Sequence, residues 1–179
     1  MKTPYKREIS ITVDKLTNSI ENAQGESFDT VCTRMTPADV AKLNSADWSF
    51  DWSDEIQQQQ TEVYKLTVVG NPSVIQGLIS IMDMGDHIFV NLINSAKHNQ
   101  GRKRMYRGVA GNMFAFACKT AFERGYQGYV AFLSKSGLVQ HYIQSLGAEQ
   151  VGRSLRLHID ETRARKLVER YFKSFWRFE

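Results

Sequence analysis

Cysteine is scarce in this chain of 179 residues: only Cys32 and Cys118 are present, and neither belongs to a CxxC motif or to a Cys/His ligand spacing. This pattern argues against a disulfide framework and against a structural zinc site. Long apolar runs are also absent, since no segment approaches the roughly 18 apolar residues that a membrane-spanning helix needs, and residues 6–13 alternate instead of forming the apolar core of a secretory signal. We therefore expect a cytoplasmic protein that needs neither a metal ion nor a membrane.

Two nucleotide-binding motifs are missing as well. The sequence contains no GxxxxGK[ST], which excludes a P-loop, and no GxGxxG followed by an acidic residue about twenty positions later, which leaves a dinucleotide-binding fold unsupported.

The composition is that of one folded domain. Hydrophobic residues make up 42% and charged residues 23% of the chain, which suffices for a sizeable core at this length. We expect a single domain over residues 1–179, with residues 1–27 as an N-terminal extension. The net charge of +4 suits an anionic ligand without requiring one.

Hydrophobic periodicity predicts an antiparallel meander over the strands between residues 62 and 94, followed by a second half of the order β-α-β-α-β. Alternating or apolar runs predict strands, and residues 14–27 read as a connection or a loose turn of helix. The expected strands are residues 6–13, 28–35, 62–70, 74–82, 87–94, 128–133 and 150–159. The expected helices begin at the Thr36-Pro37-Ala38-Asp39 start signal and in the second half of 47–56, and span 109–124, 137–146 and 161–178.

The C-terminal helix, within residues 160–179, is amphipathic and basic. Its apolar residues recur at helical spacing, and arginine and lysine occupy the rest of its surface. Such a helix can bind an anionic membrane or a partner groove, but docking on the protein's own sheet is the simpler interpretation.

The clearest chemical motif is Arg-Gly-Val-Ala-Gly-Asn, at residues 107–112, where a glycine-bearing turn opens a helix. Free N–H groups and the helix dipole favour an anion at such a turn, and glycine lets a phosphate approach the backbone. Five basic residues precede it with no acid among them: Lys97, Arg102, Lys103, Arg104 and Arg107. The alternative is that Gly108 and Gly111 only permit close helix packing and that the basic loop is a solvated face.

Met105-Tyr106-Arg107-Gly108-Val109-Ala110 resembles the acyl-CoA signature (Gln/Arg)-x-x-Gly-x-(Gly/Ala) of the GNAT acetyltransferase superfamily. The resemblance covers roughly residues 60–158 and includes the segment from Leu138 to Ala148, which is similar to the family's FYxKxGF segment. Met105 departs from the family's Gln or Arg, and the N-terminal extension and the C-terminal helix also depart from its pattern.

The resemblance implies an α/β (α+β) fold with a mixed, mainly antiparallel central sheet flanked by helices and a β-α-β core that binds acyl-CoA. It also implies an acetyltransferase that transfers an acetyl group from acetyl-CoA to an amine by direct attack. Tyr142 then corresponds to the general acid that protonates the CoA thiolate; the alternative is a half-buried tyrosine of an amphipathic helix. The residues implied in cofactor binding are Leu92, Ile93, Asn94, Arg104, Arg107, Gly108, Val109, Ala110, Gly111 and Asn112.

The acceptor side is implied to lie near an aromatic and acidic segment after the first strand. Trp48, Asp51 and Trp52, together with Asn91, would fit a cationic amine, although the tryptophans could equally be core and Asp51 a surface residue. The general base stays open among Asp51, Glu62 and a bound water.

Three functional hypotheses follow. The first is an N-acetyltransferase acting on a small-molecule or protein amine. The second is a non-catalytic module of GNAT fold that binds acyl-CoA or a partner. The third, a nucleic-acid-binding protein using the basic loop and the terminal helix, is disfavoured. The sequence leaves a homodimer open.

Overall fold

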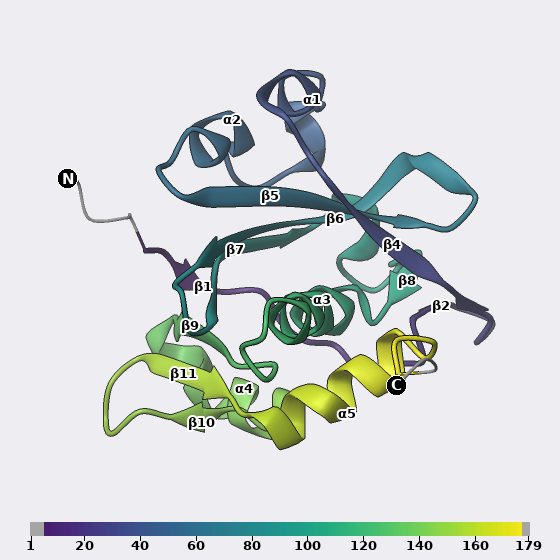
Figure 1. The fold of residues 1–179 in the computed structure, drawn as a ribbon. Coiled ribbons are helices and arrows are strands. Elements are labelled where there is room, and N and C mark those ends of the chain that lie inside the picture. Colours follow the sequence, from purple (N-terminus) through teal and green to yellow (C-terminus); the bar gives the residue numbers. More distant parts are fainter. Residues whose placement is uncertain (1–5, 177–179) are drawn as a thin grey trace.

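The computed structural model describes residues 6–176 and is built around one large sheet (Figure 1). Within this range the strands follow the path β10-β11-β9-β7-β6-β5-β4, and β1 adds to β9. These strands are β1 (Glu8–Ile9), β4 (Thr30–Arg34), β5 (Thr61–Val68), β6 (Asn71–Asp83), β7 (Ile88–Ser95), β9 (Val130–Ser134), β10 (Glu149–Gln150) and β11 (Arg156–Ile159).

The pairing is mixed and mainly antiparallel, as the GNAT resemblance implies. β4, β5, β6 and β7 form an antiparallel meander, and β9, β11 and β10 are antiparallel too. Among the strands of residues 6–176, only β7 and β1 run parallel to β9. The parallel step from β7 to β9 requires a crossover, which α3 (Val109–Glu123) provides. β7, α3 and β9 form the β-α-β unit that the GNAT resemblance implies.

Helices cover both faces of the sheet (Figure 1). On one face lie α1 (Pro37–Ala41) and α2 (Trp52–Ile56), over a hydrophobic cluster that includes Trp48, Trp52 and Leu92. On the other face α3 is buried along nearly its whole length, and α4 (Val139–Leu146) joins the same core. Short 3-10 turns occupy Ser45–Asp47, Lys97–Asn99 and Ser136–Leu138.

Local start and stop signals explain several of these helices. Thr36 is the N-cap of α1, as predicted, and in addition it forms a reciprocal capping box with Asp39. Asp51 caps α2 by accepting hydrogen bonds from the Ser53 and Asp54 amides. Gly147 ends α4 in the left-handed conformation, at a φ of 71°.

The terminal helix α5 (Glu161–Tyr171) differs from its prediction in length and in docking. It ends seven residues before the predicted end at residue 178, which itself lies outside the described residues. Its apolar stripe is buried inside the protein, at Ala164, Leu167, Val168 and Tyr171, but it packs on α3 and not directly on the sheet (Figure 1). The sheet face is already covered by α3, so α5 forms an outer layer.

The N-terminal region departs most from the sequence-based expectation. The strand predicted over residues 6–13 is paired only at Glu8–Ile9. Near the other end of the chain, the predicted strand 150–159 is also split, by a turn, into β10 and β11. Residues 14–27 are not a helical turn. They contribute to a small second sheet of β3 (Ser27–Phe28), β2 (Ile20–Asn22) and β8 (Tyr106–Arg107), which holds the start of α3 against the N-terminal region.

None of the helices in the described part of the chain has the length and apolar character needed to cross a bilayer.

Candidate functional site

The large sheet opens where β7 separates from β9. β7 pairs with β9 only at Ile88 and Phe89. Two residues further along, Asn91 forms a bulge, because its neighbours Val90 and Leu92 pair with consecutive residues of β6. A bulge bends its strand and increases the local twist. β7 therefore turns away from β9 and leaves a wedge in the sheet.

The N-terminal strap, which we define as residues 7–17, enters this wedge. β1 takes up parallel pairing with β9 just beyond the point where β7 leaves it, at Leu133 and Ser134 (Figure 1). The Lys135 N–H donates to the Ile9 carbonyl at 3.0 Å, and the Arg7 N–H donates to the Asn91 Oδ1 at 3.1 Å. The strap thus occupies backbone positions that β7 would otherwise take.

A cavity of about 340 Å³ lies between the strap, the carboxyl end of β7 and the first turn of α3. This volume is in the usual range for small-molecule sites, roughly 300–1,000 Å³. The cofactor residues predicted from the sequence that line this cavity are Ile93, Asn94, Arg104, Val109 and Ala110. The cavity therefore gathers half of that set in one place.

Three other predicted cofactor residues lie away from the cavity. Arg107 is exposed and lines a neighbouring hollow together with Arg102 and Lys15. Leu92 is buried beside Trp52 on the opposite face of the sheet. Asn112 is fully buried in α3 and accepts a hydrogen bond from the Thr30 hydroxyl at 2.7 Å.

The two glycines of the predicted phosphate turn are in close contact with the chain itself. Gly108 is the N-cap of α3 with a φ of 88°, where glycine is strongly favoured. A Cβ at Gly108 would collide with the Thr17 hydroxyl, and a Cβ at Gly111 would collide with the Tyr171 hydroxyl. Close packing therefore requires glycine at both positions, whether or not a phosphate also approaches this turn.

Asp14 places a negative charge among the basic residues at the start of α3. Its carboxylate accepts from the Gly108 N–H at 3.2 Å and from the Arg104 guanidinium at 2.8 Å. Asp14 lines both the cavity and the hollow that contains Arg107. Sequence reasoning missed this residue because it lies more than 90 positions before the helix.

Tyr142 is fully buried, and its hydroxyl donates a hydrogen bond to the Ile11 carbonyl of the strap. Burial raises the pKa of Tyr142 well above its ordinary value, so the phenol stays protonated at neutral pH. The neighbouring His141 Nε2 accepts from the Val13 N–H at 2.9 Å. The strap thus covers this end of α4.

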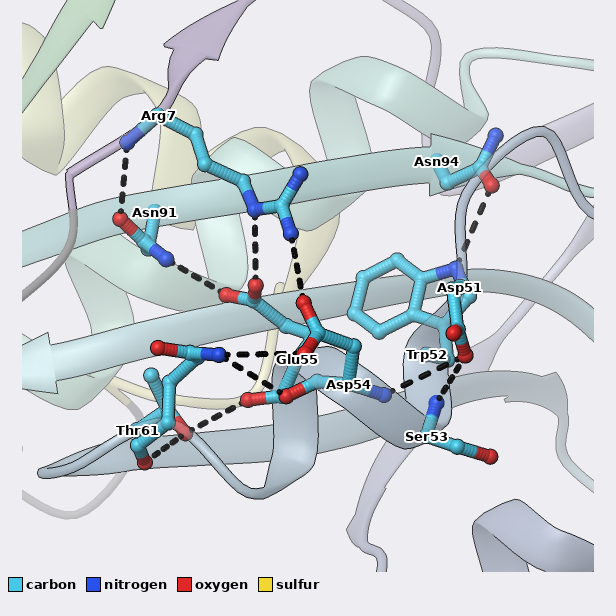
Figure 2. Close-up of polar contacts among 10 residues, drawn as sticks. Arg7, Asp51, Trp52, Ser53, Asp54, Glu55, Thr61, Asn91 and Asn94 are labelled. Atoms are coloured by element: carbon cyan, nitrogen blue, oxygen red, sulfur yellow. Dashed lines mark hydrogen bonds and ion pairs between the residues drawn. The ribbon is translucent and has the colours of Figure 1, made fainter.

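The predicted acceptor residues lie beside the cavity but are turned away from it. Trp48 and Trp52 are buried in the hydrophobic cluster, and they line a second hollow of about 320 Å³ with the exposed Asp51. The segment Ser49 to Phe50 lines both spaces and separates them. Figure 2 shows the Trp52 Nε1 directed at the Asn94 Oδ1, 3.3 Å away.

Glu55 is a buried carboxylate that the sequence did not single out. It accepts from the Arg7 Nε at 3.0 Å and from the Asn91 Nδ2 at 2.5 Å, so that α2, β7 and the strap meet at this group (Figure 2). Of the adjacent acids in α2, Asp54 is exposed and Glu55 is not. A helix of five residues shows too little periodicity for the sequence to tell which acid faces inward.

Glu62, a candidate base, does not line the cavity. It is held by Arg124 at 2.8 Å and by Arg34 at 3.1 Å. The hydrogen bond from Arg124 lowers the pKa of Glu62 below its ordinary value, so this residue is a structural anion.

Comparison with known proteins gives similarities of fold. A tyrosine-to-phenylalanine mutant of the toxin AtaT, bound to acetyl-CoA and to the C-terminus of the antitoxin AtaR, is 10% identical, covers 78% of this chain and 97% of its own, and has a TM-score of 0.48. An acetyltransferase from Bacillus subtilis in complex with CoA is 13% identical, covers 75% of this chain and 99% of its own, and has a TM-score of 0.44. No family model and no curated protein matches the sequence.

Proposed function

We propose that this chain is an N-acetyltransferase that binds acetyl-CoA at the cavity between β7 and the start of α3. The observation that carries the proposal is the cavity itself. A bulged strand, the first turn of a fifteen-residue helix and the side chain of Arg104 converge on one space beside a wedge in the sheet. This arrangement combines backbone polar groups with positive charge around a volume suited to a slender ligand.

The chain's own residues fit the parts of such a ligand. The first-turn N–H groups of α3, at Val109 and Ala110, have no partner within the helix and suit an anionic group. Arg102 and Arg107, in the adjoining hollow, suit further phosphates. Acetyl-CoA supplies the activated acyl thioester, and Ile93 and Asn94 of β7 would orient it.

Tyr142 is the proposed proton donor to the leaving thiolate. A tyrosine phenol carries its proton at neutral pH, as a donor requires. In the structure this hydroxyl is engaged by Ile11, so the role requires the strap to move.

Substitution of Arg107 tests the proposed cofactor site. Because Arg107 is exposed, Arg107→Glu should leave folding intact and reverse the charge that meets the phosphates. We expect isothermal titration calorimetry to show micromolar binding of acetyl-CoA to the unaltered protein and at least about tenfold weaker binding to the variant.

The matched control is Arg153→Glu, which reverses an exposed charge in the turn between β10 and β11. It should bind acetyl-CoA like the unaltered protein. If the unaltered protein shows no binding, or if both variants weaken it equally, the cofactor site is not where we place it.

A second candidate is a non-catalytic module that binds acyl-CoA. It is favoured by the positions of two groups: the Tyr142 hydroxyl is bonded to the strap, and Asp14, the carboxylate that lines the cavity, is bonded to Arg104. Assays of acetyl transfer to a panel of amines divide the candidates, since binding without transfer to any amine supports the module.

A further inference from the structure

The strap contacts three elements beside the wedge and the proposed acetyl-CoA site. It pairs with β9 through Ile9, contacts α4 through Ile11 and Val13, and reaches the start of α3 through Asp14 and Thr17. These contacts are spread along the whole length of the strap. They hold the strap in one defined position over the wedge.

The inner side chains of the strap fix it in place. Ile9 and Val13 are 1% and 4% exposed and belong to the main hydrophobic core. Thr17 is 1% exposed, and its N–H donates to the Tyr171 hydroxyl of α5 at 3.1 Å. Residues between these anchors, Ser10, Thr12 and Asp14, line the cavity.

Asp14 uses the groups that an anionic ligand would need. Its carboxylate engages the N-cap amide of α3 and the Arg104 guanidinium. A phosphate at this position would require the same donors and would be repelled by the carboxylate. The two anions cannot occupy the start of α3 together.

The strap also uses polar groups of the wedge. The Ile9 carbonyl accepts from the Lys135 N–H, and the Ile11 carbonyl accepts from the Tyr142 hydroxyl. An extended ligand lying in the wedge would need to replace these bonds. Backbone pairing, the tyrosine contact and the Asp14 contact therefore all oppose ligand entry.

We propose that residues 7–17 are an autoinhibitory strap, which competes with acetyl-CoA for the wedge and whose Asp14 carboxylate takes the place of a ligand phosphate. The inference rests on the function proposed above. Acetyl-CoA binds only the fraction of molecules in which the strap has left this position, so the apparent affinity is lowered by that fraction.

Asp14→Asn tests the competition. The amide keeps an oxygen that can accept from the Gly108 N–H but carries no charge to repel a phosphate or to hold Arg104. Titration calorimetry should show that acetyl-CoA binds the variant about tenfold more tightly than the unaltered protein. Glu169→Gln, which removes an exposed negative charge on α5, is the control and should leave the affinity unchanged.

Amide hydrogen exchange of the unaltered protein provides a second measurement. The Val13 amide belongs to the strap and donates to His141, so it should lose protection when acetyl-CoA is added. Equal or weaker binding by Asp14→Asn, or binding with undiminished protection at the Val13 amide, contradicts the autoinhibitory role of the strap and leaves the acetyl-CoA site standing. Failure of both proteins to bind acetyl-CoA overturns both proposals.

Discussion

The Tyr142 hydroxyl lies under the strap, and its ring packs against Phe114 and Phe132 at centroid distances of 6.0 and 5.3 Å. A buried phenol of this kind contributes to stability through its ring and its hydrogen bond, whether or not it also transfers a proton. Tyr171 offers a direct comparison, because its buried hydroxyl is also bonded to the strap, at the Thr17 N–H.

Phenylalanine substitution at these two tyrosines separates stability from catalysis. Tyr142→Phe and Tyr171→Phe each remove one buried hydrogen bond, and we expect each to lower the free energy of unfolding by about 1 kcal/mol. Only Tyr142→Phe should lower the rate of acetyl transfer, because only Tyr142 is the proposed donor. Urea unfolding measures the first effect and a thiol-release assay the second. Equal transfer rates in the two variants would remove Tyr142 from the mechanism.

At the scale of elements, α3 is held at both of its ends. Its start contacts the strap, and its C-cap residue Arg124 bridges two strands by pairing with Glu62 of β5 and with Asp83 at the end of β6. Tyr126 adds a hydrogen bond to Asp83 at 2.7 Å. The helix that forms one wall of the cavity is thereby fixed to the sheet at the opposite end.

This cluster predicts a dependence of stability on acid pH. The pKa of Glu62 is lowered in the folded protein, so its contribution is complete above the unfolded pKa, about 4.3. It is lost as pH falls through the lower folded value. Between pH 6 and pH 3 the free energy of unfolding should therefore fall less for Glu62→Gln than for the unaltered protein, as measured by urea unfolding.

Glu123→Gln is the control for this pH series. Glu123 is 48% exposed and pairs with Lys119 within α3, and such surface pairs contribute little. The free energy of unfolding of Glu123→Gln should vary with pH as it does for the unaltered protein. If Glu62→Gln showed this same pH dependence, the cluster around Glu62 would not be the cause of the loss of stability in acid.

At the scale of the whole molecule, the strap joins parts of the chain that are distant in sequence. Its first residue, Arg7, is bonded to Asn91 of β7 and to Glu55 and Asp54 of α2 (Figure 2). Its other end reaches α3 and α5 through Thr17. The strap thus connects the helices on one face of the sheet with those on the other.

The two acids that meet Arg7 allow this attachment to be tested. Glu55→Gln removes a fully buried charge partner, and we expect a loss of about 2 kcal/mol in the free energy of unfolding. Asp54 is 56% exposed, so Asp54→Asn should cost less than about 0.5 kcal/mol. Urea unfolding of both variants measures the difference. Equal losses of unfolding free energy in the two variants would mean that the burial of Glu55 does not strengthen its contribution to stability.

The sequence by itself determined the identity of most elements. The periodicity of α3, the N-cap at Thr36, the stop at Gly147 and the antiparallel meander were all predicted, and the structure confirms them. Each of these signals acts between residues a few positions apart, through side chains on one helix turn or through neighbouring strands. Such short-range interactions are legible in a single sequence.

The tertiary structure alone decided what fills the proposed site. Alternation around Ile9 indicated a strand but could not name its partner, which depends on the bulge at Asn91 and on the edge of β9 that this bulge leaves free. The same long-range arrangement brings Asp14 to the start of α3 and turns Glu55 inward. Pairing between distant segments depends on which strand edges and surfaces remain unpaired once the local elements have formed. Local sequence patterns contain no information about these edges and surfaces.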